Sequence, residues 1–520
     1  MTHLRQSFLV LLPLALAFVA LAAPRGPLFD IRDFGAKGDG RTIDSPAINA
    51  AIDAAVTAGG GRVIIPAGRF RSASIRLQSN VTLELTEGAV LLAADSAVAS
   101  YDISPANPWS DVPFKTWGHG YQDFGHSHWR NSLIWGENIE NAAIVGRGRI
   151  DGDGHLLHVA TTQTPQGHAN KAIGLVNCRN IVLRDFTATQ CGHFALLATG
   201  VDQLLIDGLR VDTGRDGLDI DSCREVRIIN TTVNTSVDDA IVLKSSFALG
   251  TPRVCENVTI TNCHVSGFDP GSYLDGTYTR KLDRANGATG RIKLGTESTG
   301  GFRNIAINNV TFDYCRGLAL ETVDGAILED IAISNITMRD VTNAPIFLRL
   351  GRRMRAPEGT AVGRLRRVII ANVTASGVSP EHGILIVGLP GRAIEDVTLS
   401  NITIEYRGGG TRADAAREVA EDEERYPEPY RFGRIPSYGL FARHVRGLNV
   451  EHLKFQTVAP DERPPLVLQD VAGFALIGLR APTTEGTPVA VLRDVSDLHF
   501  RNVNALPDRA IAGPIARGSF

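Results

Sequence analysis

Apolar and polar residues alternate in short segments that recur along most of the chain. Alternation with a period of two predicts β-strands. Each copy begins with one or two polar residues, continues with alternating apolar residues and often contains an Asn before a further β-branched position. Strong copies begin at Arg179, Asp202, Arg224, Glu256, Arg303, Glu329, Arg366 and Glu395, and weaker copies at Arg446, Ala472 and Ser496.

The best-matched neighbouring copies start 22 to 26 residues apart, which is a typical period for a solenoid. Longer intervals indicate the same coil with an inserted loop. Stacked copies would bury a continuous apolar column, and the Asn side chains at the turns could form hydrogen bonds from one rung to the next. A β-sandwich would not repeat its sequence in this way. The pattern therefore predicts an all-β fold, a right-handed parallel β-helix.

The segment before the repeats predicts a helix that caps the open end of the solenoid. Asp44 or Ser45 is positioned to cap the helix, and Ile48, Ile52 and Val56 would form its apolar face. Covering an open end in this way prevents solenoids from associating end to end.

Residues 1–23 read as a secretory signal peptide, with Arg5 before an apolar stretch and Ala20-Leu21-Ala22 as a cleavage site. The apolar stretch is short for a membrane span. We therefore expect an exported protein, with residues 24–520 forming one β-helix catalytic domain. Long non-repeating segments predict loop insertions near 96–131, 264–290 and 406–440, of which the first is rich in aromatic residues and His.

The bulk composition excludes several classes of function. A formal net charge of −3 argues against a nucleic-acid partner and against a membrane surface. Metal-ligand motifs and dinucleotide-binding motifs are missing from the sequence, so we expect no metal and no cofactor. Six cysteines would be compatible with disulfides after export, but the sequence favours no particular pairing. The oligomeric state is left open.

Candidate chemistry comes from strands that follow each repeat. Their apolar pairs, such as those in DGLDIDS and DAIVLKS, can be superposed and should face inward. Asp216 then lies one rung from Asp238 and Asp239. Because rungs are about 4.8 Å apart, we expect these carboxylates within about 5–10 Å of one another. Crowded like charges raise at least one pKa and leave a proton for general-acid chemistry. A carboxylate pair about 6.5–9.5 Å apart is typical of inverting glycosidases.

The outward-facing positions around these acids also predict a substrate site. Asp219 and Lys293 fall in one outward column, Lys244 and Glu321 fall in the next, and Arg291 lies beside them. Their cations would bind an anionic substrate.

On these motifs, residues 141–350 resemble glycoside hydrolase family 28, and residues 30–70 resemble the N-terminal segment of the pectate-lyase-like β-helix superfamily. GRDGLD is similar to the family motif N-T-D-G-[IL]-D, and DDAIVLKS is similar to D-D-C-I-A-I-K-S. The resemblance implies that Asp216 activates water, that Asp238 is the general acid, that Asp239 helps to orient the water and that Lys244 lies in the cleft. It also implies that the substrate is an acidic plant-type polysaccharide or oligosaccharide.

The chain also departs from the family pattern. The family's active-site histidine is missing from TGRIKLGT, and the row of the family's R-I-K motif holds Ala319, Leu320 and Glu321. A literal R-I-K occurs one rung earlier. His193, which we assign to the row of Arg291, is a candidate replacement for the histidine. Further candidates for a substrate subsite are the residues Tyr438, Arg443 and His444.

Three functions follow as hypotheses. The first is inverting hydrolysis of α-galacturonosyl bonds in pectin or rhamnogalacturonan, with exo action suggested by the insertions. The second is a pectate-lyase-like elimination, in which Asp216, Asp219 and Asp221 would hold Ca²⁺ and Arg291 would be the base. The third is a non-catalytic carbohydrate-binding β-helix.

Overall fold

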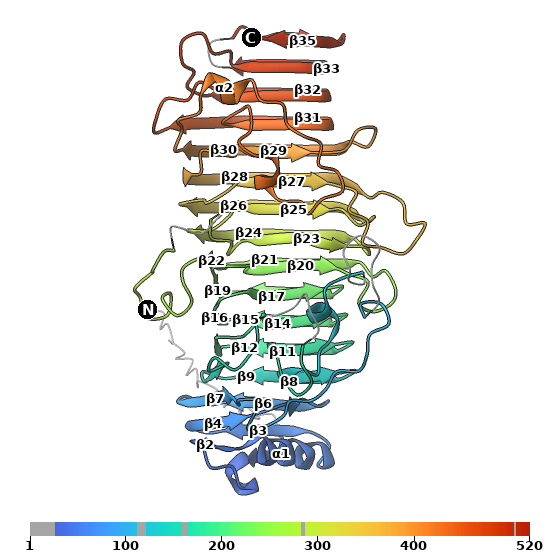
Figure 1. Ribbon diagram of the computed structural model, residues 1–520, viewed down its shortest axis with the longest axis vertical. Coiled ribbons are helices and arrows are strands. Elements are labelled where there is room, and N and C mark those ends of the chain that lie inside the picture. The colour runs from blue at the N-terminus through green and yellow to red at the C-terminus, as the bar shows by residue number, and fades with distance from the viewer. Residues whose placement is uncertain (1–25, 112–120, 159–163, 282–286, 504–505) are drawn as a thin grey trace, which may run out of the picture.

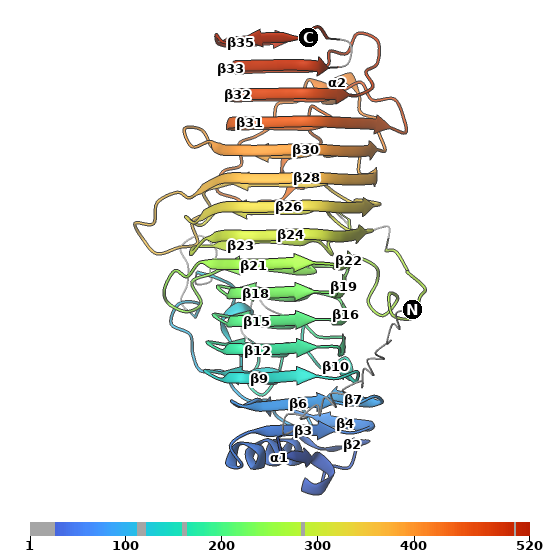
Figure 2. The same ribbon diagram turned by 180° about the vertical axis from the view of Figure 1, so that it is seen from behind.

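The computed structural model is a right-handed parallel β-helix, as the repeat predicts. It describes residues 26–111, 121–158, 164–281, 287–503 and 506–520. The predicted signal peptide, residues 1–23, lies outside the described residues. Figure 1 shows the coil rising from the N-terminal rungs to the C-terminal ones, and Figure 2 shows the opposite side.

The first face of the coil carries the candidate chemistry and faces the viewer in Figure 1. Its strands pair in parallel, each with the next. They are β5 (Ile75–Arg76), β8 (Ser132–Glu137), β11 (Lys171–Val176), β14 (Phe194–Thr199), β17 (Asp216–Asp221), β20 (Ile241–Ser245), β23 (Ile292–Ser298), β25 (Leu318–Thr322), β27 (Ile346–Leu350) and β29 (Ile384–Val387).

Two further faces complete each turn. The second, toward the viewer in Figure 2, consists of β1 (Leu28–Asp30), β3 (Gly61–Ile65), β6 (Val81–Leu85), β9 (Glu140–Val145), β12 (Arg179–Arg184), β15 (Asp202–Asp207), β18 (Arg224–Ile229) and β21 (Cys255–Thr261). The third consists of β2 (Asp39–Ile43), β4 (Gly68–Ser72), β7 (Ala89–Ala93), β10 (Arg149–Asp151), β13 (Thr187–Thr189), β16 (Arg210–Thr213), β19 (Thr232–Thr235) and β22 (His264–Ser266).

Strands of the later rungs run on around the corners. The second and third faces are joined within β24 (Phe302–Asp313), β26 (Ile327–Arg339), β28 (Arg364–Val378) and β30 (Ile394–Tyr406). All three faces are joined within β31 (Leu440–Thr457), β32 (Leu466–Arg480) and β33 (Ala490–Val503).

The register confirms the repeat. The predicted starting residues pair in one unbroken column, from Arg179 with Asp202 to Ala472 with Ser496. The apolar positions that follow each start face inward and form a core that extends along the coil. Stacking the rungs therefore buries the apolar column that the alternation predicts.

Asn side chains form the predicted ladder at the corner between the second and third faces. Asn309, Asn335 and Asn372 belong to it, and each donates its side-chain amide to the Asn of the preceding rung at 3.1–3.3 Å. All three have φ between 53° and 56°, a left-handed conformation that Asn tolerates better than most residues. The ladder thus stabilises both the corner and the stacking.

Both ends of the coil are covered. Helix α1 (Ser45–Thr57) packs on the first rungs with Ile48, Ala51, Ile52 and Ala55 buried. The predicted inward position of Val56 is wrong, because its side chain is 38% exposed and Ala55 takes its place. At the other end, β34 (Arg509–Ile511) and β35 (Ile515–Ser519) turn back antiparallel on β33. These elements cover edges that could otherwise pair with another chain.

Long connections project from the coil where the sequence predicts insertions. They span residues 94–131, 267–291 and 407–439, and include the short helices η2 (Phe124–Ser127), α2 (Arg412–Ala415) and η3 (Pro429–Phe432). A further connection, residues 351–363 between β27 and β28, is not apparent from the sequence. The remaining short helix is η1 (Ile31–Phe34), before the capping helix.

The six cysteines are all buried and unpaired. None of the helices in the described part of the chain has the length and apolar character needed to cross a membrane.

We expect Asn335→Ala to lower the free energy of unfolding by about 2 kcal/mol. The change removes two side-chain hydrogen bonds of the ladder, worth about 1 kcal/mol or less each, and places Ala in a left-handed conformation that costs about 1–2 kcal/mol. Urea denaturation measures the loss. Thr337→Ala, at an exposed position of the same strand, is the matched control, and equal losses in the two variants would contradict the role of the ladder.

Candidate active site

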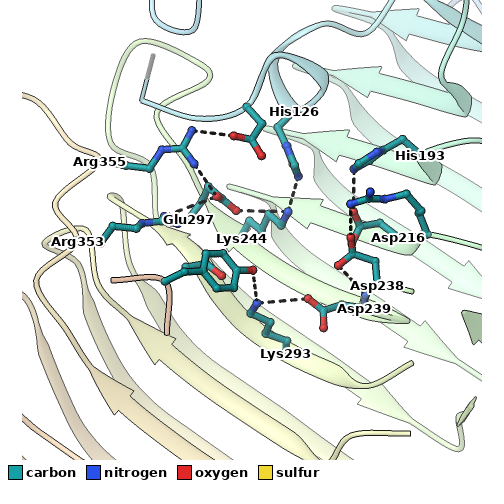
Figure 3. Close-up of a pocket in the computed structure, with 14 residues that line it drawn as sticks. His126, His193, Asp216, Asp238, Asp239, Lys244, Lys293, Glu297, Arg353 and Arg355 are labelled. Atoms are coloured by element: carbon teal, nitrogen blue, oxygen red, sulfur yellow. Dashed lines mark hydrogen bonds and ion pairs between the residues drawn. The ribbon is translucent and has the colours of Figure 1, made fainter. Parts of the chain in front are cut away.

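A cavity of about 380 Å³ opens on the first face, over strands β14, β17, β20 and β23. Insertions close around it: His126 comes from residues 94–131, Tyr426 from residues 407–439, and Arg353 and Arg355 from residues 351–363. Figure 3 shows how these side chains surround the carboxylates of the strands. Six predicted site residues line the cavity, namely His193, Asp216, Asp238, Asp239, Lys244 and Lys293.

The inner columns of the first face have the predicted register. Leu218 pairs with Ile241, which pairs with Ile292, and all three are buried in the core. Their outward neighbours therefore stack as expected, with Asp219 beside Val242 and Val242 beside Lys293. The strand positions fix the heights of the acidic and basic side chains along the coil.

Asp216 and Asp238 form a close carboxylate pair. Their nearest oxygens and a ring nitrogen of His193 all lie within 4.8 Å of one another. The nearest oxygens are thus closer than the predicted 5–10 Å, and the close approach of the rungs at Gly217 leaves no room for a side chain there. A Cβ at Gly217 would lie only 2.3 Å from the carbonyl oxygen of Ala240.

The pair is set up to hold a proton. Asp216 is 3% exposed, and burial raises its pKa to about 6. Burial, followed by the charge of Asp216, also raises the pKa of Asp238. Arg215 opposes this shift, because its Nη2 donates to Asp238 Oδ2 at 2.6 Å. Two charges 4.8 Å apart repel by about 3 kcal/mol at an effective dielectric constant of 20, so double ionisation is unfavourable.

Asp239 has the opposite environment. Its Oδ1 accepts a hydrogen bond from Arg291 Nε at 2.8 Å, and its Oδ2 lies 3.4 Å from Lys293 Nζ. Burial favours the neutral acid, but Lys293 and Arg291 outweigh it and hold the pKa of Asp239 well below the usual value. The site therefore combines a pair of acids that shares a proton with one acid that stays ionised.

His193 does not lie in the predicted row of Arg291. Because Phe194 pairs with Asp216, His193 lies at the level of Arg215, two positions before that row. Its Nε2 lies 3.4 Å from Asp216 Oδ2. Burial, followed by the charge of Arg215, holds the pKa of His193 well below its usual value, so the ring is neutral.

Lys244 stands at the centre of a second cluster. Its Nζ lies 2.5 Å from His126 Nε2, 3.0 Å from Asp219 Oδ2 and 3.4 Å from Glu297 Oε2. Burial disfavours its charge, but Asp219 and Glu297 outweigh burial and hold the pKa of Lys244 well above the usual value. The ammonium group thus joins the rungs to the 94–131 insertion.

Segment 407–439 brings two further residues to the site. The Tyr426 hydroxyl accepts from Lys293 Nζ at 3.1 Å. Glu428, 3% exposed, accepts from the guanidinium of Arg291 and lies 3.1 Å from Arg316 Nη1. Arg291 is thereby held between Glu428 and Asp239. This contact fixes the guanidinium that keeps Asp239 ionised.

Three predicted substrate-binding residues lie behind the cavity wall. Asp219, Arg291 and Glu321 are each at most 2% exposed and contact the lining residues from below. Glu321 Oε2 lies 3.5 Å from Lys293 Nζ, and burial raises the pKa of Glu321 to about 7. Direct contact of these three with a substrate is therefore not supported by the structure.

Three others lie away from the cavity, contrary to prediction. Tyr438 packs in the core against Tyr406 and Phe455, and its hydroxyl donates to the carbonyl of Pro482 at 2.5 Å. Arg443 donates to backbone carbonyls of residues 419 and 420, and His444 Nδ1 lies 2.6 Å from Asp470 Oδ2. These two side chains hold the 407–439 insertion against later rungs instead of facing the site.

Several lining residues are not predicted from the repeat. Arg215 is adjacent to Asp216 in GRDGLD, so its position could have been inferred. Glu297 could not, because the register shifts within β23: Leu243 pairs with Leu294 but Ser245 pairs with Ser298. The two extra residues turn Glu297 into the cavity. His126, Arg353, Arg355, Tyr426 and Asp123 come from connections whose paths the strand pattern does not define.

Two groups of side chains in the described residues could hold a metal ion, His126 with Asp216 and Asp219, and His193 with Asp216 and Asp238. The Lys244 ammonium lies 3.0 Å from Asp219 and already supplies a positive charge to the first group. In the second group, Arg215 supplies one to Asp238. The donor sets therefore fit a charge-paired cluster better than a divalent metal site.

Comparison with known proteins agrees with the class defined by the fold. Residues 28–107 match the family model "Rhamnogalacturonase A/epimerase, pectate lyase-like". A hyperthermoactive exopolygalacturonase from Thermotoga maritima has a similar fold, with a TM-score of 0.56 and 19% sequence identity, covering 83% of this chain and 92% of that one. The chain thus shares the β-helix fold of these proteins.

Within this class, the predicted resemblance to glycoside hydrolase family 28 is confirmed. Residues 105–271, which include the three aspartates predicted to be catalytic, match the family model "Glycosyl hydrolases family 28". A probable polygalacturonase from Vitis vinifera is 26% identical over 59% of this chain. An exo-poly-α-D-galacturonosidase from Dickeya chrysanthemi is 36% identical over 24% of this chain. The matches span 60% and 20% of the lengths of these two relatives.

We expect Arg291→Gln to lower the free energy of unfolding by about 3–5 kcal/mol, because it leaves the buried carboxylates of Asp239 and Glu428 without their shared cation. Chemical denaturation measures this loss. Arg303→Gln is the matched control: this side chain is 51% exposed and pairs with Glu256, so its loss should be much smaller. A loss at Arg291 as small as that of the control would show that the network does not stabilise the fold.

Proposed function

We propose that the protein is an exported glycoside hydrolase that cleaves α-galacturonosyl linkages in pectin or rhamnogalacturonan, or in oligosaccharides derived from them. The observation that carries the proposal is the carboxylate pair Asp216–Asp238, which shares a cavity with the ionised Asp239. Glycoside hydrolysis needs one carboxylic acid to protonate the leaving oxygen and one carboxylate to activate water or to attack.

The roles of the three acids follow from the family resemblance and from their environments. Asp238 is the more accessible member of the pair, with 27% of its side chain exposed, and would protonate the glycosidic oxygen. Asp216 and Asp239 would orient and activate the water. The neutral ring of His193, 3.4 Å from Asp216, would hold Asp216 in place without adding charge.

An anionic substrate fits the composition of the cavity wall. Arg215, Lys244, Lys293, Arg353 and Arg355 all line the cavity. Five acids line it as well. Because the pKa values of Asp216 and Asp238 are raised, these two acids share one proton and together carry one negative charge instead of two. The lining therefore carries a small positive excess, which favours a uronate over a neutral sugar.

Exo action is favoured by the way in which the insertions enclose the cavity. Arg355 Nη2 donates to Asp123 Oδ1 at 3.2 Å, and this ion pair joins residues 351–363 to residues 94–131 across the site. A long polymer passing through would have to break this contact. The end of a polysaccharide chain could enter the cavity without breaking it.

Inversion is proposed from the family resemblance and not from the carboxylate spacing. Inverting pairs are typically about 6.5–9.5 Å apart and retaining pairs about 5–5.5 Å apart. The nearest oxygens of Asp216 and Asp238 lie within 4.8 Å. Inversion at this spacing requires that the water bind beside the pair, between Asp216 and Asp239. Following the product anomer by NMR distinguishes the two outcomes.

The pectate-lyase alternative is less well supported by the geometry. Asp221 turns away from Asp216 and Asp219, since its carboxylate accepts from the backbone N–H and hydroxyl of Ser246 at 2.8 and 2.5 Å. Arg291, the supposed base, is held between two carboxylates. Loss of activity in a chelator, together with unsaturated products, would favour the lyase.

Export is proposed from the sequence of residues 1–23, which has the three parts of a secretory signal. N-terminal sequencing of the mature protein from the culture medium or periplasm tests it.

We expect Asp238→Asn to lower kcat on oligogalacturonate by about 100- to 10,000-fold, because the general acid is lost. Affinity for the same oligosaccharide, measured by calorimetry, should change little. Asp275→Asn, at an exposed loop acid that bonds only to Thr277 among the described residues, is the control and should retain activity. Unchanged turnover in Asp238→Asn would eliminate the assigned role, and binding without turnover in the unaltered protein would favour the non-catalytic β-helix.

We expect kcat/KM to fall as the pH rises above about 6, the pKa to which burial raises Asp216. The Asp216–Asp238 pair loses its last proton in this range, and with it the general acid; at low pH a second proton removes the base. Arg215→Gln removes the cation that favours ionised Asp238, so its alkaline limb should move to higher pH. A rate that stays constant well into the alkaline range would contradict the shared proton.

A further inference from the structure

The chain lacks the cations of the family's R-I-K motif in the expected row, so other cations would have to bind the substrate carboxylate. The row in which the family has R-I-K contains Ala319, Leu320 and Glu321, and Glu321 is a buried acid. Of the lining cations, Arg215 is bonded to Asp238, Lys244 is bonded to Asp219, and Lys293 lies between Asp239 and Glu321. These three pair with the candidate catalytic acids or with buried acids of the strands. Arg353 and Arg355 pair instead with Asp324 and Asp123, which lie outside the strands of the first face.

These two arginines come from residues 351–363 and are anchored from behind. The Nε and Nη2 atoms of Arg353 donate to both oxygens of Asp324, at 3.0 and 2.5 Å. The backbone N–H of Arg355 donates to the same carboxylate at 2.9 Å. Each residue is 6% exposed, so little of either guanidinium is free to move. Asp324 therefore fixes the guanidinium of Arg353 and the backbone of Arg355, whose own guanidinium donates to Asp123.

A carboxylate already occupies the space that they share. Glu297 Oε1 lies 3.6 Å from Arg353 Nη2 and 3.7 Å from Arg355 Nη1, while its Oε2 lies 3.4 Å from Lys244 Nζ. The two arginine distances are longer than a hydrogen bond, so these N–H groups keep donor capacity for a second carboxylate. Glu297 shows that this corner stabilises a carboxylate, and these cations hold its pKa well below the usual value despite burial.

Figure 3 shows the corner on the far side of the cavity from His193 and Asp216. A sugar that places its glycosidic oxygen at the Asp216–Asp238 pair would extend across the cavity toward Arg353 and Arg355. We infer that Arg353 and Arg355 form the subsite that binds the carboxylate of a uronate residue of the substrate. The inference rests on the proposed function and replaces the family's R-I-K row by a pair from an insertion.

The test compares substrates with and without the carboxylate charge. Arg355→Gln should lower kcat/KM on oligogalacturonate by about 10- to 100-fold, the loss expected for a hydrogen bond to a charged group. On the methyl-esterified oligosaccharide the loss should be about 2-fold or less, because the charged acceptor is missing. Arg355→Lys keeps the charge and should recover part of the loss on the acid. Equal losses on both substrates would overturn the inference.

Arg352→Gln is the matched control. Arg352 is the immediate neighbour of Arg353, but its side chain is 48% exposed and pairs with Glu423 and Glu424. Both substrates should be cleaved normally by this variant. Arg353→Gln is a second variant, whose fold is verified by circular dichroism before it is assayed. The inference would also be overturned if both Arg353→Gln and Arg355→Gln kept the preference of the unaltered protein for oligogalacturonate over its methyl ester.

Failure of the proposed function is distinguishable from failure of the subsite. If the unaltered protein cleaves neither substrate, hydrolysis is wrong, and the subsite is tested by calorimetry with galacturonate trimers. Weaker binding of the acid trimer by Arg355→Gln than by Arg352→Gln then supports the subsite. Equal binding by the two variants rejects it.

Discussion

Hydrogen bonds between successive strands of the first face fix the height of every charged group in the cavity. Rungs of a parallel sheet are about 4.8 Å apart, so charged groups on successive strands lie within reach of one another. Lys244 lies 3.0 Å from Asp219 on the preceding strand, and Lys293 lies near Asp239 of the preceding rung and Glu321 of the next one. Pairing of opposite charges offsets the cost of burying them, whereas the like charges of Asp216 and Asp238 favour retention of a proton.

This constraint also explains how the insertions are held. Two of them bond to charged side chains of the coil: His126, in residues 94–131, to Lys244, and the carbonyls of residues 421 and 422, in residues 407–439, to Arg349. Loops without regular structure lose much conformational entropy when they are ordered. Buried charge-assisted hydrogen bonds offset that cost. The coil therefore positions the acids, and the charges left on its outer face position the walls of the cavity.

The sequence predicts what depends on strand periodicity. Repeat starts, inner columns and the convergence of Asp216, Asp238 and Asp239 all follow from a period of two and a constant register, and the structure agrees. Glu297 was missed because β23 contains two extra residues, which a constant register cannot reveal. The sequence does not place Tyr438, because a tyrosine is equally compatible with a sugar-binding site and with the core. In the core its hydroxyl donates to the carbonyl of Pro482.

Partners of each acid decide where the proton of the site resides. Asp239 has two cations beside it and stays ionised. Burial raises the pKa of Asp216 against the opposing charge of Lys244, and the neighbouring imidazole of His193 is neutral. Asp238 lies between these cases. Its bond to Arg215 favours the charged form by an amount similar to the repulsion from Asp216, about 1.5–3 kcal/mol against about 3 kcal/mol. Asp216 and Asp238 therefore titrate as one pair that shares a proton. Any group that draws Arg215 away raises the pKa of Asp238 and shifts the shared proton toward the carboxylate that faces the cavity.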